Sequence, residues 1–231
     1  MSAEEEDLAI GFRINKRTRK VDDETVAKYR DIAVANISDS MSRMTHGGAR
    51  LRPLHSGGVL AGPALTVKQR PGDNLMVHAA LNRAEPGDVL VVDAGGDLTN
   101  AIVGELMLAY AQQIGMAGVV VYGAVRDYGW IRKNDFPVFA AGVTHRGPYK
   151  NGPGEVNGTI AIDGMVIEPG DLIVGDDDGL ICVPFADTEA VYAAANAKQQ
   201  GEAKTMAAIK AGTNDRSWVE AALKAANCEG A

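Results

Sequence analysis

The sequence predicts an α/β fold that is extended by helices at both ends of the chain. Over the middle of the chain, apolar runs such as Val89–Val92 alternate with stretches of helical periodicity, which is typical of α/β units. From Gly154 onward, short apolar runs are separated by Asn-Gly, Asp-Gly and Pro-Gly pairs, and this pattern predicts an antiparallel meander. Because no linker-like stretch interrupts the strands, we expect one domain rather than two.

The order of the elements follows from the same patterns. Residues 22–44 begin with acidic capping candidates and continue with apolar residues at helical spacing, and Ser38 or Asp39 is the expected cap of a second short helix. A helix over residues 72–84 is expected to begin at Asp73 or Asn74. The other expected elements are a strand at 58–70 bent at Gly62-Pro63, a strand at 89–92, a helix at 104–115, a strand at 118–125, a short helical step at 127–135, a strand at 136–143, the meander at 154–184, and helices at 186–212 and 217–227.

Charge and composition exclude several classes of protein. The formal net charge is −7, which argues against nucleic-acid binding. We interpret the basic segment Gly11–Lys20, which follows an acidic stretch, as a solvated N-terminal arm, with a subunit contact as the alternative. The start lacks the features of a signal peptide and no apolar run is long enough to cross a membrane, so the expected compartment is the cytoplasm.

Several smaller patterns receive structural interpretations. The turn Glu-Pro-Gly-Asp occurs at Glu85–Asp88 and Glu168–Asp171. We interpret it as the same favourable turn sequence used at two places rather than as a sign of an internal duplication of the chain. Asp176–Gly179 is expected to be a hairpin turn rather than a cation site, and Lys150 a solvated loop lysine rather than a substrate contact. Cys182 is expected in the core. The glycines of residues 152–158 do not fit a dinucleotide-binding loop, and the histidines at 46, 55, 78 and 145 have no zinc spacing and are expected to be structural or exposed.

Candidate binding and catalytic side chains lie at two strand ends. Arg126 and Asp127 follow a buried strand, at the edge where open α/β sheets bind ligands. On an extended chain the two side chains would point to opposite sides and make a poor mutual salt bridge, so each is free for a ligand: the guanidinium for a carboxylate, the carboxylate for Mg²⁺. A surface ion pair with Asp127 as a helix cap is the competing interpretation. The other strand end leads through Gly104 into a helix, where the free amides of residues 105–107 would form an anion site.

These strand ends resemble a known family. The matching segments are GELM at Gly104–Met107 and GAVRD at Gly123–Asp127, and residues 136–148 and 170–184 are also similar. The segments resemble the class II pyruvate aldolases that cleave 4-hydroxy-4-methyl-2-oxoglutarate and 4-carboxy-4-hydroxy-2-oxoadipate, which share their fold with the regulator of ribonuclease activity A. The likeness covers about residues 37–210. It implies a swivelling β/β/α catalytic domain at 37–186, an N-terminal arm and helix at 1–36, and C-terminal helices at 187–231 that pack on the domain or on a neighbouring subunit.

The resemblance also implies roles for individual residues. The substrate loop would consist of Gly104, Glu105, Leu106 and Met107, with backbone amides that receive the pyruvyl carboxylate. Arg126 would bind the substrate and Asp127 would ligate the divalent cation, Mg²⁺ or Mn²⁺. Glu105 would hold metal-bound water, and Glu202 would come from the C-terminal helix of a neighbouring subunit in a homotrimer or a dimer of trimers.

The implied function is that of a metal-dependent carbon–carbon lyase. It would cleave a 4-hydroxy-2-oxo dicarboxylic or tricarboxylic acid to pyruvate and a keto acid, and decarboxylate oxaloacetate as a side activity. The alternative is a non-catalytic regulator of a ribonuclease complex on the same fold. The short regulators lack the C-terminal extension, so its presence here favours the enzyme, although a different acid substrate on the same scaffold stays open.

Overall fold

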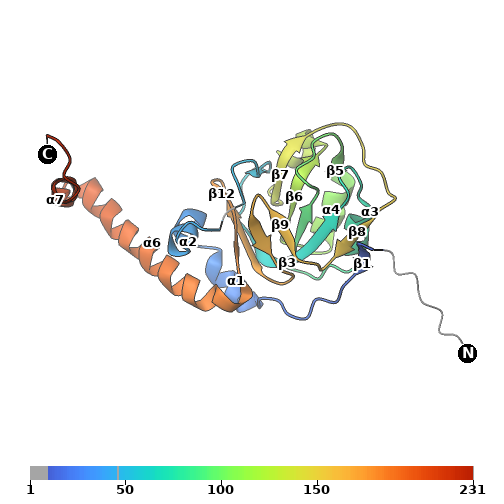
Figure 1. Ribbon diagram of the computed structural model, residues 1–231, viewed down its shortest axis with the longest axis horizontal. Helices are drawn as coiled ribbons and strands as arrows, with labels where there is room; N and C mark the ends of the chain where they lie inside the picture. The colour runs from blue at the N-terminus through green and yellow to red at the C-terminus, as the bar shows by residue number, and fades with distance from the viewer. Residues whose placement is uncertain (1–9, 46, 231) are drawn as a thin grey trace, which may run out of the picture.

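A mixed β-sheet forms the centre of the molecule, and helices lie at its sides (Figure 1). The computed structural model describes residues 10–45 and 47–230. In chain order the elements are β1 (Phe12–Ile14), α1 (Asp23–Tyr29), α2 (Val34–Ser40), β2 (Arg52–Pro53), β3 (Leu60–Gln69), α3 (Leu75–Leu81), β4 (Val89–Asp93), β5 (Ala101–Val103), α4 (Glu105–Gln113), β6 (Gly118–Val125), α5 (Tyr128–Ile131), β7 (Val138–Val143), β8 (Gly154–Val156), β9 (Ile160–Ile162), β10 (Met165–Ile167), β11 (Leu172–Asp176), β12 (Gly179–Val183), a short 3-10 helix (Phe185–Asp187), α6 (Thr188–Ala211) and α7 (Ser217–Ala225). The predicted α/β class is confirmed.

Four parallel strands form the middle of the sheet. The order across it is β1-β8-β3-β4-β6-β7-β2, and β3, β4, β6 and β7 run parallel to one another. β3 pairs with β11 through residues 60–63 and with β4 through residues 64–68, so the expected bend at Gly62-Pro63 coincides with the point where this strand changes partner. Parallel strands buried on two faces read as continuous apolar runs, which is why β4 and β6 were visible in the sequence.

Alternate residues of these strands face two different cores. Val92 and Val121 pack with the helices α3 and α4, whereas Val91 and Val120 pack with the hairpin β9–β10 on the opposite face. A third core joins α1, α2 and the start of α6 to the outer side of the hairpin β11–β12. Figure 1 shows α2 and α6 at one side of the molecule and α3 at the other. The molecule is therefore layered, and α3 and α4 lie together on one side.

Three details differ from the sequence-based expectations. The predicted meander is wrong as a single sheet, because β9–β10 forms a separate two-stranded sheet and β8 pairs with β1 and β3. Ser38 and Asp39 lie inside α2, which begins one turn earlier after Ala33, because the backbone amide of Val34 bonds to the carboxylate of Asp176. The strand β5 was missed, because its three residues follow a turn-rich stretch.

The basic N-terminal segment is largely exposed, as expected of a solvated arm, but it is anchored to the body of the molecule. The side chain of Arg17 is only 10% exposed and donates to both carboxylate oxygens of Asp88, at 2.7 and 3.0 Å. Arg19 is more exposed, and one of its nitrogens contacts both Glu168 and Asp171. The two Glu-Pro-Gly-Asp turns are therefore held by one basic segment, called the N-terminal strap below (residues 17–20). The acidic stretch at residues 1–9 and His46 lie outside the described residues.

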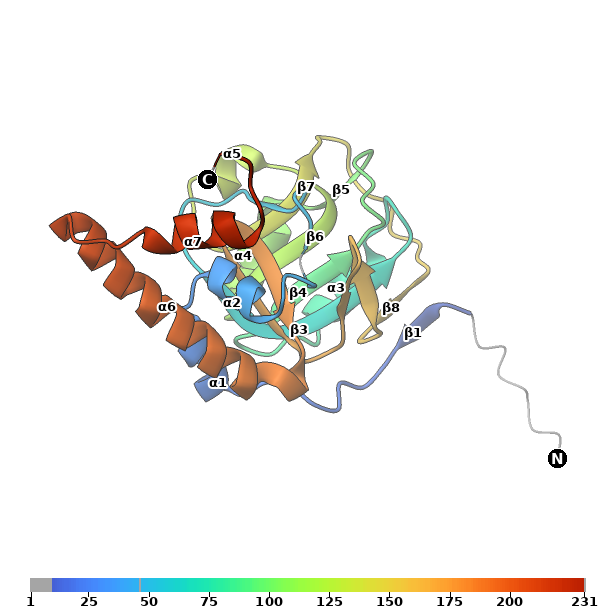
Figure 2. The same cartoon turned by 60° about the vertical axis from the view of Figure 1, so that its left-hand side comes forward.

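The helix α6 extends beyond the body of the molecule (Figures 1 and 2). Its first half packs on α1 and α2, but from Gly201 to its end nearly every residue is exposed. Met206 and Ile209 are each 51% exposed in this second half. Across the described part of the chain, no helix combines the length and apolar character needed to cross a membrane.

Candidate active site

Two loops converge at the carboxyl ends of β5 and β6. The strand β5 pairs with residues 124–125 at the end of β6, and the backbone amide of Arg126 donates to the carbonyl of Val103 at 3.0 Å. One residue further on, the carboxylate oxygen Oδ2 of Asp127 accepts from the amide of Glu105 at 2.9 Å. The structure therefore brings Gly104, the start of α4, Arg126 and Asp127 together in one place.

Gly104 permits this close approach because it has no side chain. A Cβ atom built on Gly104 would lie 2.4 Å from Oδ2 of Asp127 and 2.8 Å from Cγ of Arg126. The backbone of Gly104 is extended, with φ −150° and ψ −171°, so the requirement for glycine is space rather than backbone conformation. Any other residue at 104 would push the two loops apart.

Asp127 adopts a left-handed backbone conformation, with φ 60° and ψ 36°. The turn brings its carboxylate back toward Arg126, and Nε of Arg126 lies 3.7 Å from Oδ2 of Asp127. The expectation that these side chains diverge was wrong, because it assumed an extended chain. Asp127 occupies the N-cap position of α5 without capping that helix by its side chain, and caps the first turn of α4 instead.

The anion site at the start of α4 is smaller than expected. The amide of Glu105 is taken by Asp127, and the amide of Met107 bonds to the carbonyl of Gly104 at 3.1 Å. Of the amides of residues 105–107, only that of Leu106 has no hydrogen-bond acceptor within the described residues. Leu106 is 84% exposed. One free amide at a helix N-terminus still favours an anion there.

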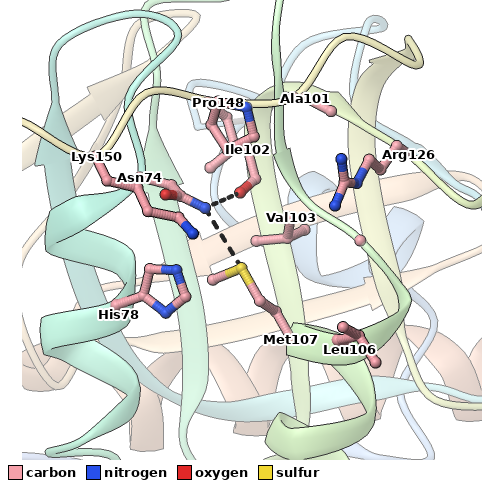
Figure 3. A pocket seen from close by; sticks show the side chains of 12 residues that line it. Asn74, His78, Ala101, Ile102, Val103, Leu106, Met107, Arg126, Pro148 and Lys150 are labelled. Carbon is pink, nitrogen blue, oxygen red and sulfur yellow. Dashed lines mark hydrogen bonds between the residues drawn. The ribbon is translucent and has the colours of Figure 1, made fainter.

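A pocket of about 320 Å³ opens beside these loops (Figure 3). Its lining comes from α3, β5, the start of α4, the end of β6 and the loop at 147–150. The lining residues are Asn74, His78, Ala101, Ile102, Val103, Gly104, Leu106, Met107, Arg126, Gly147, Pro148 and Lys150. They include two permanent cations, Arg126 and Lys150, and no carboxylate, so the pocket suits an anionic ligand although the whole chain is acidic.

Sequence reasoning missed one wall of this pocket. Lys150 is exposed, as expected of a loop lysine, but it also lines the pocket, and so do Asn74 and His78. Asn74 and His78 are four residues apart around the first turn of α3, which places them on one face of the helix. That spacing was the available signal, but nothing local showed that this face meets the loop at 147–150.

Asp73 holds the Lys150 loop in place. It is fully buried, and its carboxylate accepts from the amides of Leu75 at 2.9 Å and Asn151 at 2.6 Å. The amide of Tyr149 donates to the carbonyl of Gly72 at 2.8 Å nearby. The start of α3 and the loop therefore form one rigid wall, opposite Arg126.

His78 is neutral near pH 7. Burial lowers the pKa of its imidazole below the ordinary value of 6.5, and the positive charge of Lys150 lowers it further. A neutral imidazole adds no charge to the wall, so the positive potential of the pocket comes from Arg126 and Lys150.

The two glutamates predicted for the site lie in different places. Glu105 is exposed in the first turn of α4, beside Asp127. Glu202 lies on α6, where it accepts from Nδ2 of Asn36 at 3.0 Å and lies 3.7 Å from Nζ of Lys198. Glu202 does not line the pocket of its own chain. A role for Glu202 at the site therefore requires a second copy of the chain.

Asp127 offers one free carboxylate oxygen, which suits a hard cation whose remaining ligands are oxygens of water and of a bound molecule. Within residues 10–45 and 47–230, no three His, Cys, Asp or Glu side chains form a metal-binding group. Asp127 uses Oδ2 for its contacts, while its Oδ1 has no hydrogen-bond partner in the described part of the chain. One free carboxylate oxygen, completed by water and by a chelating ligand, is an arrangement that Mg²⁺ accepts and a structural zinc site does not.

The chain is thus a layered α/β protein with a cationic pocket at the edge of its sheet, where two strands end. The chain belongs to the Aldolase/RraA family, described as RraA-like, whose model matches residues 34–182. A protein of Halalkalibacterium halodurans, provisionally named a 4-hydroxy-4-methyl-2-oxoglutarate aldolase, is 41% identical over 174 residues, which are 75% of this chain and 83% of the relative. A similarly named protein of Burkholderia multivorans is 41% identical over 131 residues, 57% of this chain and 79% of its own length.

Solved structures share the fold. The crystal structure of RraAS2 from Streptomyces coelicolor, named an unusual member of the RNase ES inhibitor RraA family, matches with a TM-score of 0.73 and 28% identity. The match covers 81% of this chain and 98% of that chain. The predicted RraA-like fold is therefore confirmed, and the family holds proteins named as aldolases beside proteins named as ribonuclease inhibitors.

Proposed function

We propose that this protein is a divalent-metal-dependent aldolase. It cleaves a 4-hydroxy-2-oxo dicarboxylic or tricarboxylic acid to pyruvate and a keto acid, and it decarboxylates oxaloacetate as a side reaction. The observation that carries the proposal is the convergence of Arg126, Asp127 and the start of α4 at one edge of the sheet, beside a cationic pocket that Arg126 lines. The names of the relatives at 41% identity support the same chemistry.

The pocket accommodates both ends of such a substrate. The pyruvyl carboxylate binds at the guanidinium of Arg126 and the free amide of Leu106, since a guanidinium fork and a helix N-terminus are both carboxylate receptors. The distal carboxylate binds toward Lys150 on the opposite wall. A monocarboxylic ligand would leave one of the two cations without a partner.

Asp127 would hold the cation through its free oxygen. Bound Mg²⁺ or Mn²⁺ supplies Lewis-acid polarisation of the 2-keto group. Arg126 faces the oxygen on which negative charge develops as the C3–C4 bond breaks and its electron pair moves into the pyruvyl fragment. The C4 hydroxyl must lose its proton in this step, and we assign proton removal to Glu105 together with Glu202 of a neighbouring subunit in a homotrimer or a dimer of trimers. Decarboxylation of oxaloacetate needs no such base, so it should tolerate the loss of either glutamate better.

The direct test is oxaloacetate decarboxylation by the purified chain. Turnover should require Mg²⁺ or Mn²⁺, disappear with EDTA and fall at least about a hundredfold in Asp127→Asn. The matched control is Asp135→Asn, because Asp135 is an exposed aspartate outside the pocket. Turnover that ignores EDTA, or that survives Asp127→Asn unchanged, would refute the proposal.

A second function is favoured by one comparison. The similarity to RraAS2 supports a non-catalytic regulator of a ribonuclease complex, a protein that would bind its target without any chemistry at the pocket. Absence of metal-dependent turnover together with stable binding to a ribonuclease, measured by co-sedimentation, would favour this function over the aldolase.

A further inference from the structure

His78 presents an unpaired imidazole to the pocket. The residue lies on α3, is partly exposed and lines the cavity. Neither ring nitrogen has a hydrogen-bond partner within the described residues, and neither belongs to the unpaired side-chain atoms that are sealed from solvent there. Figure 3 shows the ring extending from α3 into the space between this helix and Met107. Its nitrogens are therefore open to a ligand in the pocket.

Lys150 is the charged neighbour of this ring. Its positive charge lowers the pKa of His78, which requires the two side chains to lie near each other on the wall formed by α3 and the loop at 147–150. Figure 3 shows the amino group of Lys150 and the imidazole on the same side of the cavity, and Arg126 across from them. Two neighbouring nitrogen donors can each bind one oxygen of a single carboxylate.

The charges around the ring determine its protonation state. Within the described residues, α4 and β5 contribute no titratable side chain to the lining of the pocket, the loop contributes Lys150 and the end of β6 contributes Arg126. The carboxylates of Glu105 and Asp127 lie beside the pocket without lining it. The ring is therefore neutral in the unliganded protein and does not repel Lys150. A carboxylate bound at this wall would reverse the balance, because a negative charge favours the imidazolium form.

We propose that His78 is a specificity residue for the distal carboxylate of the substrate, and that its ring donates a hydrogen bond to the carboxylate with which Lys150 pairs. This inference rests on the proposed aldolase function and deepens it, because it assigns a residue to the half of the substrate that Arg126 does not bind. The imidazole takes up a proton from solvent as the carboxylate binds, so a charge-assisted hydrogen bond forms. The pocket thereby selects 2-oxo acids that carry a second carboxylate at the far end.

The coupling between proton and ligand has a definite sign. The pKa of His78 lies below 6.5 in the unliganded protein, and a bound carboxylate raises it, so proton uptake is largest at a pH between the two pKa values. The affinity for a dicarboxylic 2-oxo acid should therefore increase as the pH falls from about 8 to about 6.5. Below the lower pKa the ring is already charged, and the affinity no longer changes through His78.

The experiment compares 2-oxoglutarate with 2-oxopentanoate in the presence of Mg²⁺. The two acids have the same carbon chain, but only 2-oxoglutarate has the distal carboxylate, and neither is a β-keto acid that could decarboxylate. Calorimetry in two buffers of different ionisation enthalpy should show uptake of about half a proton or more per 2-oxoglutarate near neutral pH, and none with 2-oxopentanoate. In His78→Gln the uptake should disappear and the affinity for 2-oxoglutarate should fall about tenfold, while that for 2-oxopentanoate changes less than about twofold.

His145→Gln is the matched control. His145 is an exposed histidine in the loop after β7 and does not line the pocket, so this variant should keep the proton uptake of the unmodified protein. Glutamine retains an N–H donor but cannot be protonated, so His78→Gln separates the charge of the ring from its hydrogen bond. Proton uptake that survives in His78→Gln, or that is equal for the two acids, would overturn the inference.

NMR of the imidazole protons follows the same event in the unmodified protein. The chain has four histidines, and the signal that is missing in His78→Gln should titrate below pH 6.5 without ligand and above it with 2-oxoglutarate. His55 is the internal reference, because its ring contacts the carbonyls of Val138 and Gly58 outside the pocket. An unchanged pKa of His78 would overturn the inference and leave the aldolase proposal intact. Absence of metal-dependent turnover would instead refute the aldolase proposal, and with it this inference.

Discussion

At the residue scale, the site depends on one glycine and on one aspartate in a left-handed conformation. Gly104 leaves room for the carboxylate of Asp127, and the left-handed backbone of Asp127 turns that carboxylate toward the start of α4. Aspartate tolerates this conformation better than most residues, and such conformations gather where function demands them. The two positions act together, because a change at either one moves the same hydrogen bond.

Gly104→Ala should therefore abolish turnover without unfolding the protein. The new Cβ would lie 2.4 Å from Oδ2 of Asp127, so the loops must separate and the bond to the amide of Glu105 must lengthen. We expect oxaloacetate decarboxylation to fall at least about a hundredfold, and the free energy of unfolding to fall by about 1–3 kcal/mol. Steady-state kinetics and urea denaturation measure the two effects.

Gly201→Ala is the control for this substitution. Gly201 lies in the middle of α6 on the exposed part of the helix, and a Cβ there meets nothing within 4 Å. Alanine in an exposed helix interior should stabilise by roughly 0.5–1 kcal/mol and leave kcat unchanged. If Gly104→Ala retained full activity, the close approach of the two loops would have no catalytic importance.

At the element scale, the N-terminal strap ties two distant turns to one segment. Asp88 is fully buried, and its carboxylate accepts from the amide of Glu85 as well as from Arg17. Asp171 has the same arrangement, with the amide of Glu168 bound to its carboxylate. The two Glu-Pro-Gly-Asp turns thus share one internal hydrogen bond, and each is contacted by a different arginine of the strap, Arg17 or Arg19.

Arg17→Met should destabilise the fold strongly at neutral pH. It leaves the buried carboxylate of Asp88 without its cation, which costs about 3–5 kcal/mol in comparable buried pairs. Arg13→Met is the control, because the side chain of Arg13 is 58% exposed in its ion pair with Glu155 and should contribute at most about 1 kcal/mol. Urea denaturation of both variants measures the difference, and equal effects would contradict the proposed importance of the strap.

The contact between Lys20 of the strap and Glu85 gives stability a pH dependence of definite sign. Contacts with Lys20, and to a smaller extent with Arg17, lower the pKa of Glu85 below its ordinary value of 4.5. A lowered pKa means that the ionised form stabilises the fold above about pH 4.5, and that this contribution is lost as the pH falls through the folded-state pKa. The stability difference between the unmodified protein and Lys20→Met should therefore shrink below pH 4.5, which denaturation at pH 7 and pH 3.5 would reveal.

At the scale of the whole molecule, the sequence predicted what depends on local patterns. The strands β4 and β6 are continuous apolar runs, and the motifs at Gly104 and Arg126 were each visible locally, but the strand that brings Gly104 beside Arg126 is β5, which was missed. The wall of Asn74 and Lys150 could not be predicted, because the contact of α3 with the loop at 147–150 joins segments more than 70 residues apart through the buried carboxylate of Asp73. The strap was misread for the same reason, since the charge of its residues was visible but their partners were not.

Within the described residues, the second half of α6 projects from the body of the molecule and is mostly exposed. Glu202, Met206 and Ile209 are spaced four and three residues apart, so they lie along one stripe of the helix. Two exposed apolar side chains on such a stripe indicate a contact with another chain. A neighbouring copy that covers this stripe would also receive Glu202, which fits the proposed homo-oligomer with a shared site.

The double variant Met206→Asp and Ile209→Asp should therefore weaken assembly and aldol cleavage together. Two carboxylates on the stripe would have to be desolvated at the interface, so sedimentation velocity should show a trimer or hexamer for the unmodified chain and smaller species for the variant. Aldol cleavage should fall with assembly, while oxaloacetate decarboxylation should fall less, because it does not need Glu202. Lys204→Asp changes charge on the opposite side of the helix and should leave the assembly intact. An unmodified chain that sediments as a monomer with full aldol activity would exclude any contribution of Glu202 from a neighbouring subunit.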